Sequence, residues 1–175
     1  MKISGFYDES ISNGLGWRAV LFVSGCPHHC KGCHNSITWD FNYGEDFNQE
    51  EIINKIVNNS ILKGVTISGG EPLCKENIKA VLEFIKKIKE LKPNFNIWCY
   101  SGYTFEELKA RNDKITNEIL NTIDVLVDGK FILAKKDPKI KFRGSSNQRV
   151  IDVKETLKQG RIIRVDLGEQ ELVTN

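Results

Sequence analysis

The sequence has almost no excess of charge, few histidines and no long apolar run. Its 175 residues carry 25 Lys and Arg against 23 Asp and Glu. Because the two signs are interspersed, we expect no nucleic-acid partner. No apolar stretch approaches the roughly 20 residues that a membrane-spanning helix requires, and no signal-peptide pattern opens the chain. We therefore expect no membrane association and a cytoplasmic, reducing location.

The cysteine content is also small, and its odd number argues against a disulfide framework. The chain has 5 cysteines and is long enough to build a core without disulfides. Cys74 and Cys99 are isolated, and we interpret them as small buried apolar side chains. The others, Cys26, Cys30 and Cys33, are crowded into the stretch SGCPHHCKGCHN together with all 3 histidines of the chain. This stretch is the main candidate for a functional site.

The spacing C-x3-C-x2-C suits a metal or an iron–sulfur cluster. A [4Fe–4S] cluster is ordinarily held by four cysteines. Three would leave one iron open to a small molecule, as catalytic zinc sites keep one position open. With a histidine as fourth ligand, a structural Cys3His zinc site is equally available from this spacing. Glycines and Pro27 predict a loop, here called the cysteine loop (residues 24–35), after a buried strand over 17–24.

A second motif follows another predicted strand, over 65–68. Gly69, Gly70 and Glu71 begin a GGEP turn at its end. Two adjacent glycines let the backbone approach a ligand closely, and the carboxylate after them could pair with a ligand ammonium group. Alone, such a sequence usually marks only a turn. Its combination with the cysteine loop is far more specific.

Together the two motifs resemble the radical S-adenosylmethionine superfamily. The resemblance implies a [4Fe–4S] cluster on Cys26, Cys30 and Cys33, and S-adenosyl-L-methionine on its open iron. It also implies cofactor contacts from the backbone of Gly32, Cys33 and His34, and contacts to the methionine end from Gly69, Gly70 and Glu71. His34 departs from the family pattern, in which an aromatic residue is common at this position.

The order of motifs over residues 13–153 narrows the resemblance to activating proteins of class III anaerobic ribonucleoside-triphosphate reductases. The segments DVLVDGKF (124–131) and FRGSSNQR (142–149) separate this family from most of the superfamily. Arg143, Asn147 and Arg149 of the second segment could contact the cofactor or a partner, and an ordinary turn is the alternative.

The resemblance implies an oxidoreductase that generates a glycyl radical. Reductive cleavage of S-adenosylmethionine at the cluster gives a 5′-deoxyadenosyl radical, which takes hydrogen from a glycine α-carbon of the reductase. The electron comes from an external donor such as reduced flavodoxin. Activation of another glycyl radical enzyme, of the formate-lyase type, is one alternative. A non-catalytic zinc-binding module is another.

Two further candidates follow predicted strands, where α/β enzymes gather functional residues. Ser101 could touch the ribose or adenine, and the alternative is a turn leading into the helix that Thr104 caps. Lys130 could pair with the cofactor carboxylate, and a surface lysine is the alternative. No general acid or base is expected beyond the cluster ligands.

The chain length predicts a single domain over 1–175, with 166–175 as a loose tail. Strands and helices alternate, which predicts an α/β fold with a mainly parallel sheet. Because the chain is shorter than the roughly 250 residues of a complete (β/α)8 barrel, we expect a partial, open β/α barrel with a radical S-adenosylmethionine core. Its predicted elements are strands over 17–24, 64–68, 96–100 and 124–128, and helices beginning near Asn48, ending before Pro93 and beginning after Thr104.

Overall fold

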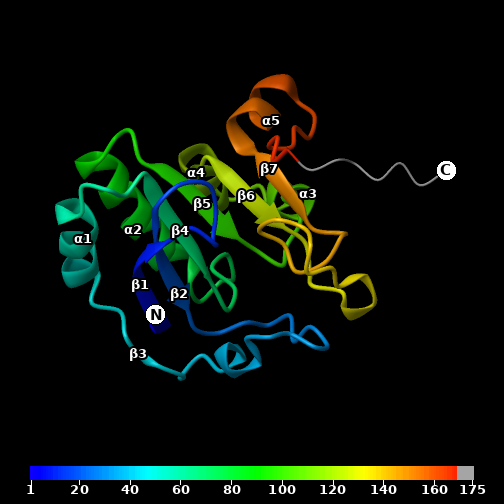
Figure 1. Ribbon diagram of the computed structural model, residues 1–175, viewed down its shortest axis with the longest axis horizontal. Helices are drawn as coiled ribbons and strands as arrows, with labels where there is room; N and C mark the ends of the chain where they lie inside the picture. Colours follow the sequence, from blue (N-terminus) through cyan, green and yellow to red (C-terminus); the bar gives the residue numbers. More distant parts are fainter. Residues whose placement is uncertain (169–175) are drawn as a thin grey trace.

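A single sheet of seven strands organises the computed structural model, which describes residues 1–168 (Figure 1). In spatial order the strands are β3 (Glu45–Asp46), β1 (Lys2–Ser10), β2 (Arg18–Val23), β4 (Gly64–Gly69), β5 (Asn96–Tyr100), β6 (Val125–Asp128) and β7 (Arg149–Asp152). The central four, β2, β4, β5 and β6, are parallel, whereas β1, β3 and β7 pair antiparallel at the edges. The expected α/β fold with an open, mostly parallel sheet is confirmed. The barrel and its radical S-adenosylmethionine core remain a prediction.

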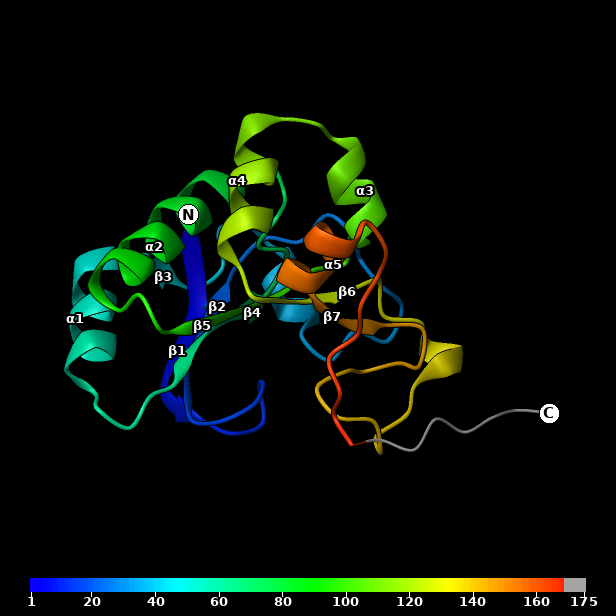
Figure 2. The ribbon, with the colours of Figure 1, turned by 90° about the horizontal axis from the view of Figure 1, so that it is seen from above.

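Helices cover one face of this sheet (Figure 2). They are α1 (Gln49–Asn58), α2 (Ile78–Leu91), α4 (Lys114–Thr122) and α5 (Val153–Gln159), with the short α3 (Phe105–Ala110) beside them. Each strand sends alternate side chains to this face. Leu21, Ile67 and Leu126 lie there, fully buried in the larger core.

The opposite face has a smaller core and is partly covered by loops. Trp98 and Val127 lie there, and Phe142 packs edge-on against the Trp98 ring. Arg18 is also buried on this side, and its guanidinium donates to Thr66 Oγ1, Asn96 Oδ1 and three backbone carbonyls. These acceptors explain how a charged group can be buried at the amino ends of the strands.

The helix starts follow the capping signals of the sequence. The side chain of Asn48 accepts the N–H of Glu51 at the start of α1, and Thr104 forms a reciprocal capping box with Glu107 at the start of α3. The helical stretch expected after Thr104 is divided in two. Asn112 adopts a left-handed conformation with φ 49°, and Asp113 caps the new helix α4.

The predicted loose tail, residues 166–175, is described only as far as residue 168. Residues 169–175 of the predicted tail lie outside the described residues, while Leu167 packs against the smaller core. Within residues 1–168, no helix has the length and apolar character needed to cross a membrane.

The parallel strands bring the predicted motifs to one edge of the sheet. The cysteine loop leaves β2, the GGEP turn leaves β4, Ser101 follows β5, and Gly129 follows β6. Because β2, β4, β5 and β6 run in the same direction, these four segments meet at their carboxyl ends.

Candidate functional site

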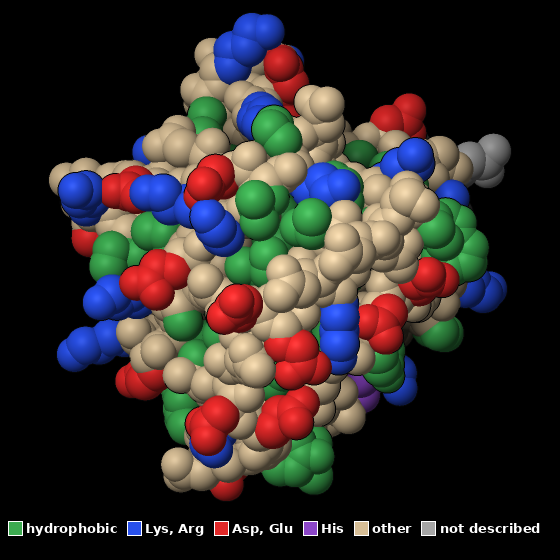
Figure 3. Space-filling view, turned by 90° about the vertical axis from the view of Figure 1, so that its left-hand side faces the viewer, with side chains coloured by type: hydrophobic (Ala, Val, Ile, Leu, Met, Phe, Trp, Pro, Cys, Tyr) green, Lys and Arg blue, Asp and Glu red, His purple; other side chains and the backbone are tan. Residues whose placement is uncertain are grey.

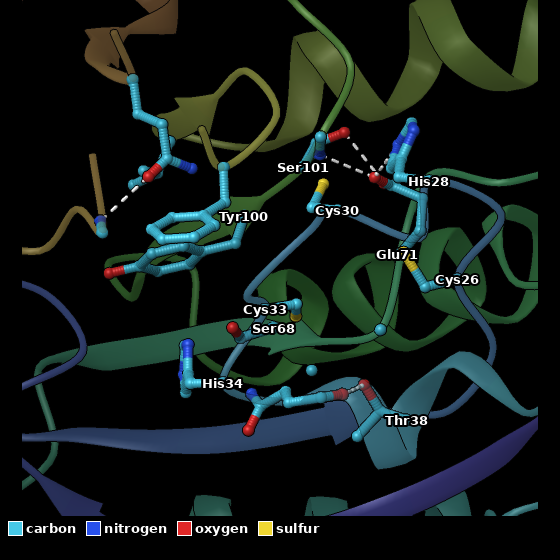
Figure 4. A pocket seen from close by; sticks show the side chains of 18 of the residues that line it. Cys26, His28, Cys30, Cys33, His34, Thr38, Ser68, Glu71, Tyr100 and Ser101 are labelled. Carbon is cyan, nitrogen blue, oxygen red and sulfur yellow. Dashed lines mark hydrogen bonds and ion pairs between the residues drawn. The ribbon is translucent and has the colours of Figure 1, made fainter. Parts of the chain in front are cut away.

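A cavity of about 370 Å³ lies at the carboxyl ends of the parallel strands. Most of the predicted site residues line it, and Figure 4 shows several of them facing one another. The lining members of the predicted set are Cys26, Cys30, Cys33, His34, Gly69, Gly70, Glu71 and Ser101. Gly32 and Lys130 are exposed and are not among the lining residues.

The three cysteines of the loop are free and half-buried. They share the cavity, yet within residues 1–168 no three Cys, His, Asp or Glu side chains form a group that could hold one metal ion. A zinc ion needs all its ligands within about 2.3 Å of one point, whereas each cysteine of a cluster binds a different iron. Thiols placed around one cavity suit such a cluster.

Burial and nearby backbone N–H groups act in opposite directions on the pKa values of Cys26 and Cys30. Burial raises the pKa of Cys26 to about 11, and the N–H groups of His28 and His29 partly oppose this shift. Burial likewise raises the pKa of Cys30, against the N–H of Phe131 and the positive charge of Lys130. These two thiols are therefore protonated at neutral pH, and metal binding must displace their protons. The same N–H groups would stabilise the thiolates that form.

Glu71 is the most heavily hydrogen-bonded side chain of the site. It is 0% exposed. Its Oε2 accepts from His28 Nε2 at 2.8 Å and from the Gly102 N–H at 2.6 Å. Its Oε1 accepts from Ser101 Oγ at 2.8 Å and from the Leu73 N–H at 2.9 Å. Because both oxygens are used by the protein, contact with a ligand ammonium group would require displacing one of these donors. The observed role of Glu71 is to join the loops.

The two glycines before Glu71 are required by the backbone beside them. A Cβ on Gly70 would lie 2.4 Å from the carbonyl oxygen of Gly25, and one on Gly69, where φ is +97°, would lie 2.5 Å from that of Val23. The N–H groups of Gly70 and Glu71 donate to the carbonyls of Val23 and Gly25 at 2.7 and 2.8 Å. The glycines thus let the GGEP turn pack directly on the start of the cysteine loop.

His28 is held by contacts on several sides, and the sequence pointed to it only as a zinc ligand. Its ring packs edge-on against Tyr103 with centroids 4.4 Å apart, and Arg111 lies over the Tyr103 ring at 4.2 Å. A Cβ on Gly102 would lie 2.3 Å from the His28 ring, so glycine is required there too. The stretch CPHHC contains no signal for these contacts.

The remaining predicted residues divide between the cavity and its surroundings. Ser101 is buried, lines the cavity and also accepts the Tyr103 N–H at 3.1 Å, so the predicted turn before α3 is present. Arg143 lines the cavity as well. Arg149 instead pairs with Asp128 and Glu106, which holds its guanidinium in that ion-pair network.

Comparison with known proteins gives consistent results. Residues 12–151 match the family model described as a 4Fe-4S single cluster domain. A protein of Haemophilus influenzae is 42% identical over 152 residues, covering 85% of this chain and 96% of its own length. One of Escherichia coli K12 is 40% identical over 154 residues (86% and 97%), and one of phage T4 is 34% identical over 152 residues (86% and 93%). All three are named anaerobic ribonucleoside-triphosphate reductase-activating protein.

Proposed function

This chain belongs to the family of anaerobic ribonucleoside-triphosphate reductase-activating proteins and carries its 4Fe-4S single cluster domain, and on that premise we propose that it activates such a reductase by reductive cleavage of S-adenosylmethionine. When bound, the reduced cluster supplies one electron that splits the cofactor into methionine and a 5′-deoxyadenosyl radical, which removes hydrogen from a glycine of the reductase. A cytoplasmic location and a donor such as reduced flavodoxin are part of the proposal.

The arrangement of the three thiols is the observation that carries this proposal. Cys26, Cys30 and Cys33 are the half-buried cysteines of the described chain, and all three line one cavity. Three ligands would leave one iron of a four-iron cluster without a protein ligand. We assign these three residues as the cluster ligands.

The rest of the cavity would bind and shield the cofactor. The backbone of Gly32 to His34 is proposed to border it, with Gly69, Gly70 and Ser101 on the strand side and Lys130 near the rim. Glu71 is proposed to support this site through its four donors. Aromatic and aliphatic side chains of the wall would exclude water from a reactive intermediate: Phe22, Tyr100, Val127, Phe131 and Phe142.

Anaerobic reconstitution tests the proposal. The protein would be loaded with iron and sulfide, reduced with dithionite and given S-adenosylmethionine, and 5′-deoxyadenosine would be measured. We expect its formation by the unmodified protein and by a Cys99→Ala variant, and its loss with Cys30→Ala. A glycyl-radical EPR doublet should then appear on the anaerobic ribonucleotide reductase and not on a formate-lyase. Binding of one zinc ion without sulfide would overturn the assignment.

A further inference from the structure

We infer that the connection between β6 and β7, here called the rim loop (residues 130–148), is a preformed docking surface for the protein substrate, and that it fits a partner surface with acidic side chains around an apolar spot. This inference rests on the proposed function, because it supplies a protein substrate for the same cavity. It concerns the segment FRGSSNQR, which the chemistry of the cluster leaves unexplained.

The rim loop touches the cysteine loop and also forms a wall of the cavity. Leu133 packs on Gly32, where an added Cβ would lie 2.9 Å from Leu133 Cδ1. Phe131, Phe142 and Arg143 line the cavity together with Cys30. The rim loop therefore borders the cavity that a glycine α-carbon of the protein substrate would have to enter.

Side-chain hydrogen bonds fix the base of the rim loop. Gln148 Oε1 accepts the N–H groups of Gly144 and Ser145 at 2.9 and 3.1 Å, and its Nε2 donates to the Gly129 carbonyl at 2.9 Å. Asn147 Nδ2 donates to the Lys130 carbonyl at 2.8 Å. The loop is thus ordered before any partner binds, which lowers the entropic cost of association.

Two further bonds tie the two arms of the loop to each other. Ser145 Oγ accepts the Ile132 N–H at 3.2 Å, and the Ser146 N–H donates to the Lys135 carbonyl at 2.8 Å. The hydrogen bonds within the rim loop come from four consecutive residues of FRGSSNQR: Ser145, Ser146, Asn147 and Gln148. The segment that marks the family therefore builds the scaffold of this surface.

The exposed side chains of the rim loop are apolar and basic. Ile132 and Leu133 are 40% and 45% exposed, next to the exposed Lys135 and Lys136. Residues 130–143 contain 6 basic residues and 1 acidic residue, although the whole chain is nearly balanced. Acidic and basic side chains are instead mixed on the side that carries α1 (Figure 3), away from the rim loop in Figure 1. A partner surface that complements the rim is accordingly acidic around an apolar centre.

The test separates docking from chemistry. A variant with Lys135→Glu and Lys136→Glu should cleave S-adenosylmethionine with dithionite as the unmodified protein does when no reductase is present. Its affinity for the anaerobic reductase should fall about tenfold or more at low salt, with a matching loss of glycyl radical. Ile132→Asp should weaken binding in the same way. The control variant, Lys86→Glu with Lys87→Glu on α2, should bind normally.

Different failures give different results in these assays. Unchanged reductase affinity in both rim variants would overturn the docking inference, as would a rim variant that loses binding to nucleic acid while keeping its affinity for the reductase. Absence of 5′-deoxyadenosine from the unmodified protein would contradict the proposed function instead. Reductase affinity is measured separately, so it would still report on the rim loop.

Discussion

His28 Nε2 lies 2.8 Å from Glu71 Oε2, and this bond joins the cysteine loop to the GGEP turn. Because the other three contacts of the Glu71 carboxyl are donors, Nε2 is assigned as the fourth donor. The same carboxylate holds Ser101 and Gly102 at the end of β5. One buried side chain thus links three segments that surround the cavity, and its loss should affect both the fold and the site.

Glu71→Gln should destabilise the protein even before any cofactor is added. The glutamine side chain has one acceptor oxygen, so its amide NH₂ would face two of the four present donors. One of these two is a backbone N–H, of Gly102 or Leu73, which cannot accept in turn. Because an unsatisfied buried donor costs roughly 1–3 kcal/mol, we expect the free energy of unfolding to fall by about that amount. Urea unfolding of the metal-free protein measures this. Glu107→Gln on the exposed cap of α3 should cost much less, and an equal loss there would contradict the role of Glu71.

His28→Phe should impair the cluster site, and His28→Gln should restore much of it. The amide of glutamine can donate to Glu71, whereas phenylalanine fills space without a donor. We expect the phenylalanine variant to retain less iron and sulfide after reconstitution and to show a broadened EPR signal of the reduced cluster. His29→Asn, which removes the ring stacked on Trp39, is the control on the same loop. Equal iron content in the two His28 variants would exclude a role for the hydrogen bond.

Asp124 should contribute stability that is lost in acid. Burial opposes its ionisation, but hydrogen bonds from Lys154, the Ile97 N–H and Lys89 outweigh burial and hold its pKa below the ordinary value. A lowered folded-state pKa stabilises the protein above the unfolded pKa of about 3.9, and this contribution disappears as the pH falls through the folded value. Asp124→Asn should therefore cost roughly 1–3 kcal/mol at pH 7. The difference from the unmodified protein should shrink below about pH 4, and a constant difference would refute this explanation.

Alkylation of the metal-free protein should distinguish two classes of cysteine. Cys26, Cys30 and Cys33 are half-buried, whereas Cys74 and Cys99 are each 1% exposed. Iodoacetamide should modify the first three under native conditions and the other two only after unfolding, as peptide mass spectrometry would detect. Because burial raises the pKa of Cys26 to about 11, its modification rate should rise about tenfold per pH unit between about 7 and 10. Early modification of Cys99 would show that the core opens readily.

Local sequence patterns predicted the central sheet but not its edges. The strands β2, β4, β5 and β6 are short apolar runs with turn residues at their ends, which is a strong local signal. β1 contains Ser, Gly, Asp and Glu and is partly exposed, so its pairing with β2 depends on tertiary contacts rather than on a periodic pattern. β7, with four residues, pairs antiparallel to β6 for the same reason.

The site was predictable only where its residues are adjacent in sequence. The spacing of the cysteines and of Gly69 and Gly70 is visible in the chain, and the structure brings these motifs to one cavity. The donors to Glu71 come from His28, Leu73 and the segment 101–102. Distances between such segments are set by strand order, which no local pattern encodes. Glu71 makes four hydrogen bonds within the protein, and its contact with a ligand stays a prediction.

The division of the cysteines between an accessible loop and the core has a consequence for damage by oxygen. In the proposed cluster site, oxidants would first reach the accessible thiols and the iron without a protein ligand. Cys74 and Cys99 lie in the core, sheltered from the same attack. Air should therefore destroy the cluster and leave the fold of the surrounding protein intact. A protein inactivated in this way needs only thiol reduction and fresh iron and sulfide. Reconstitution of the cluster, without new protein synthesis, should therefore restore its activity.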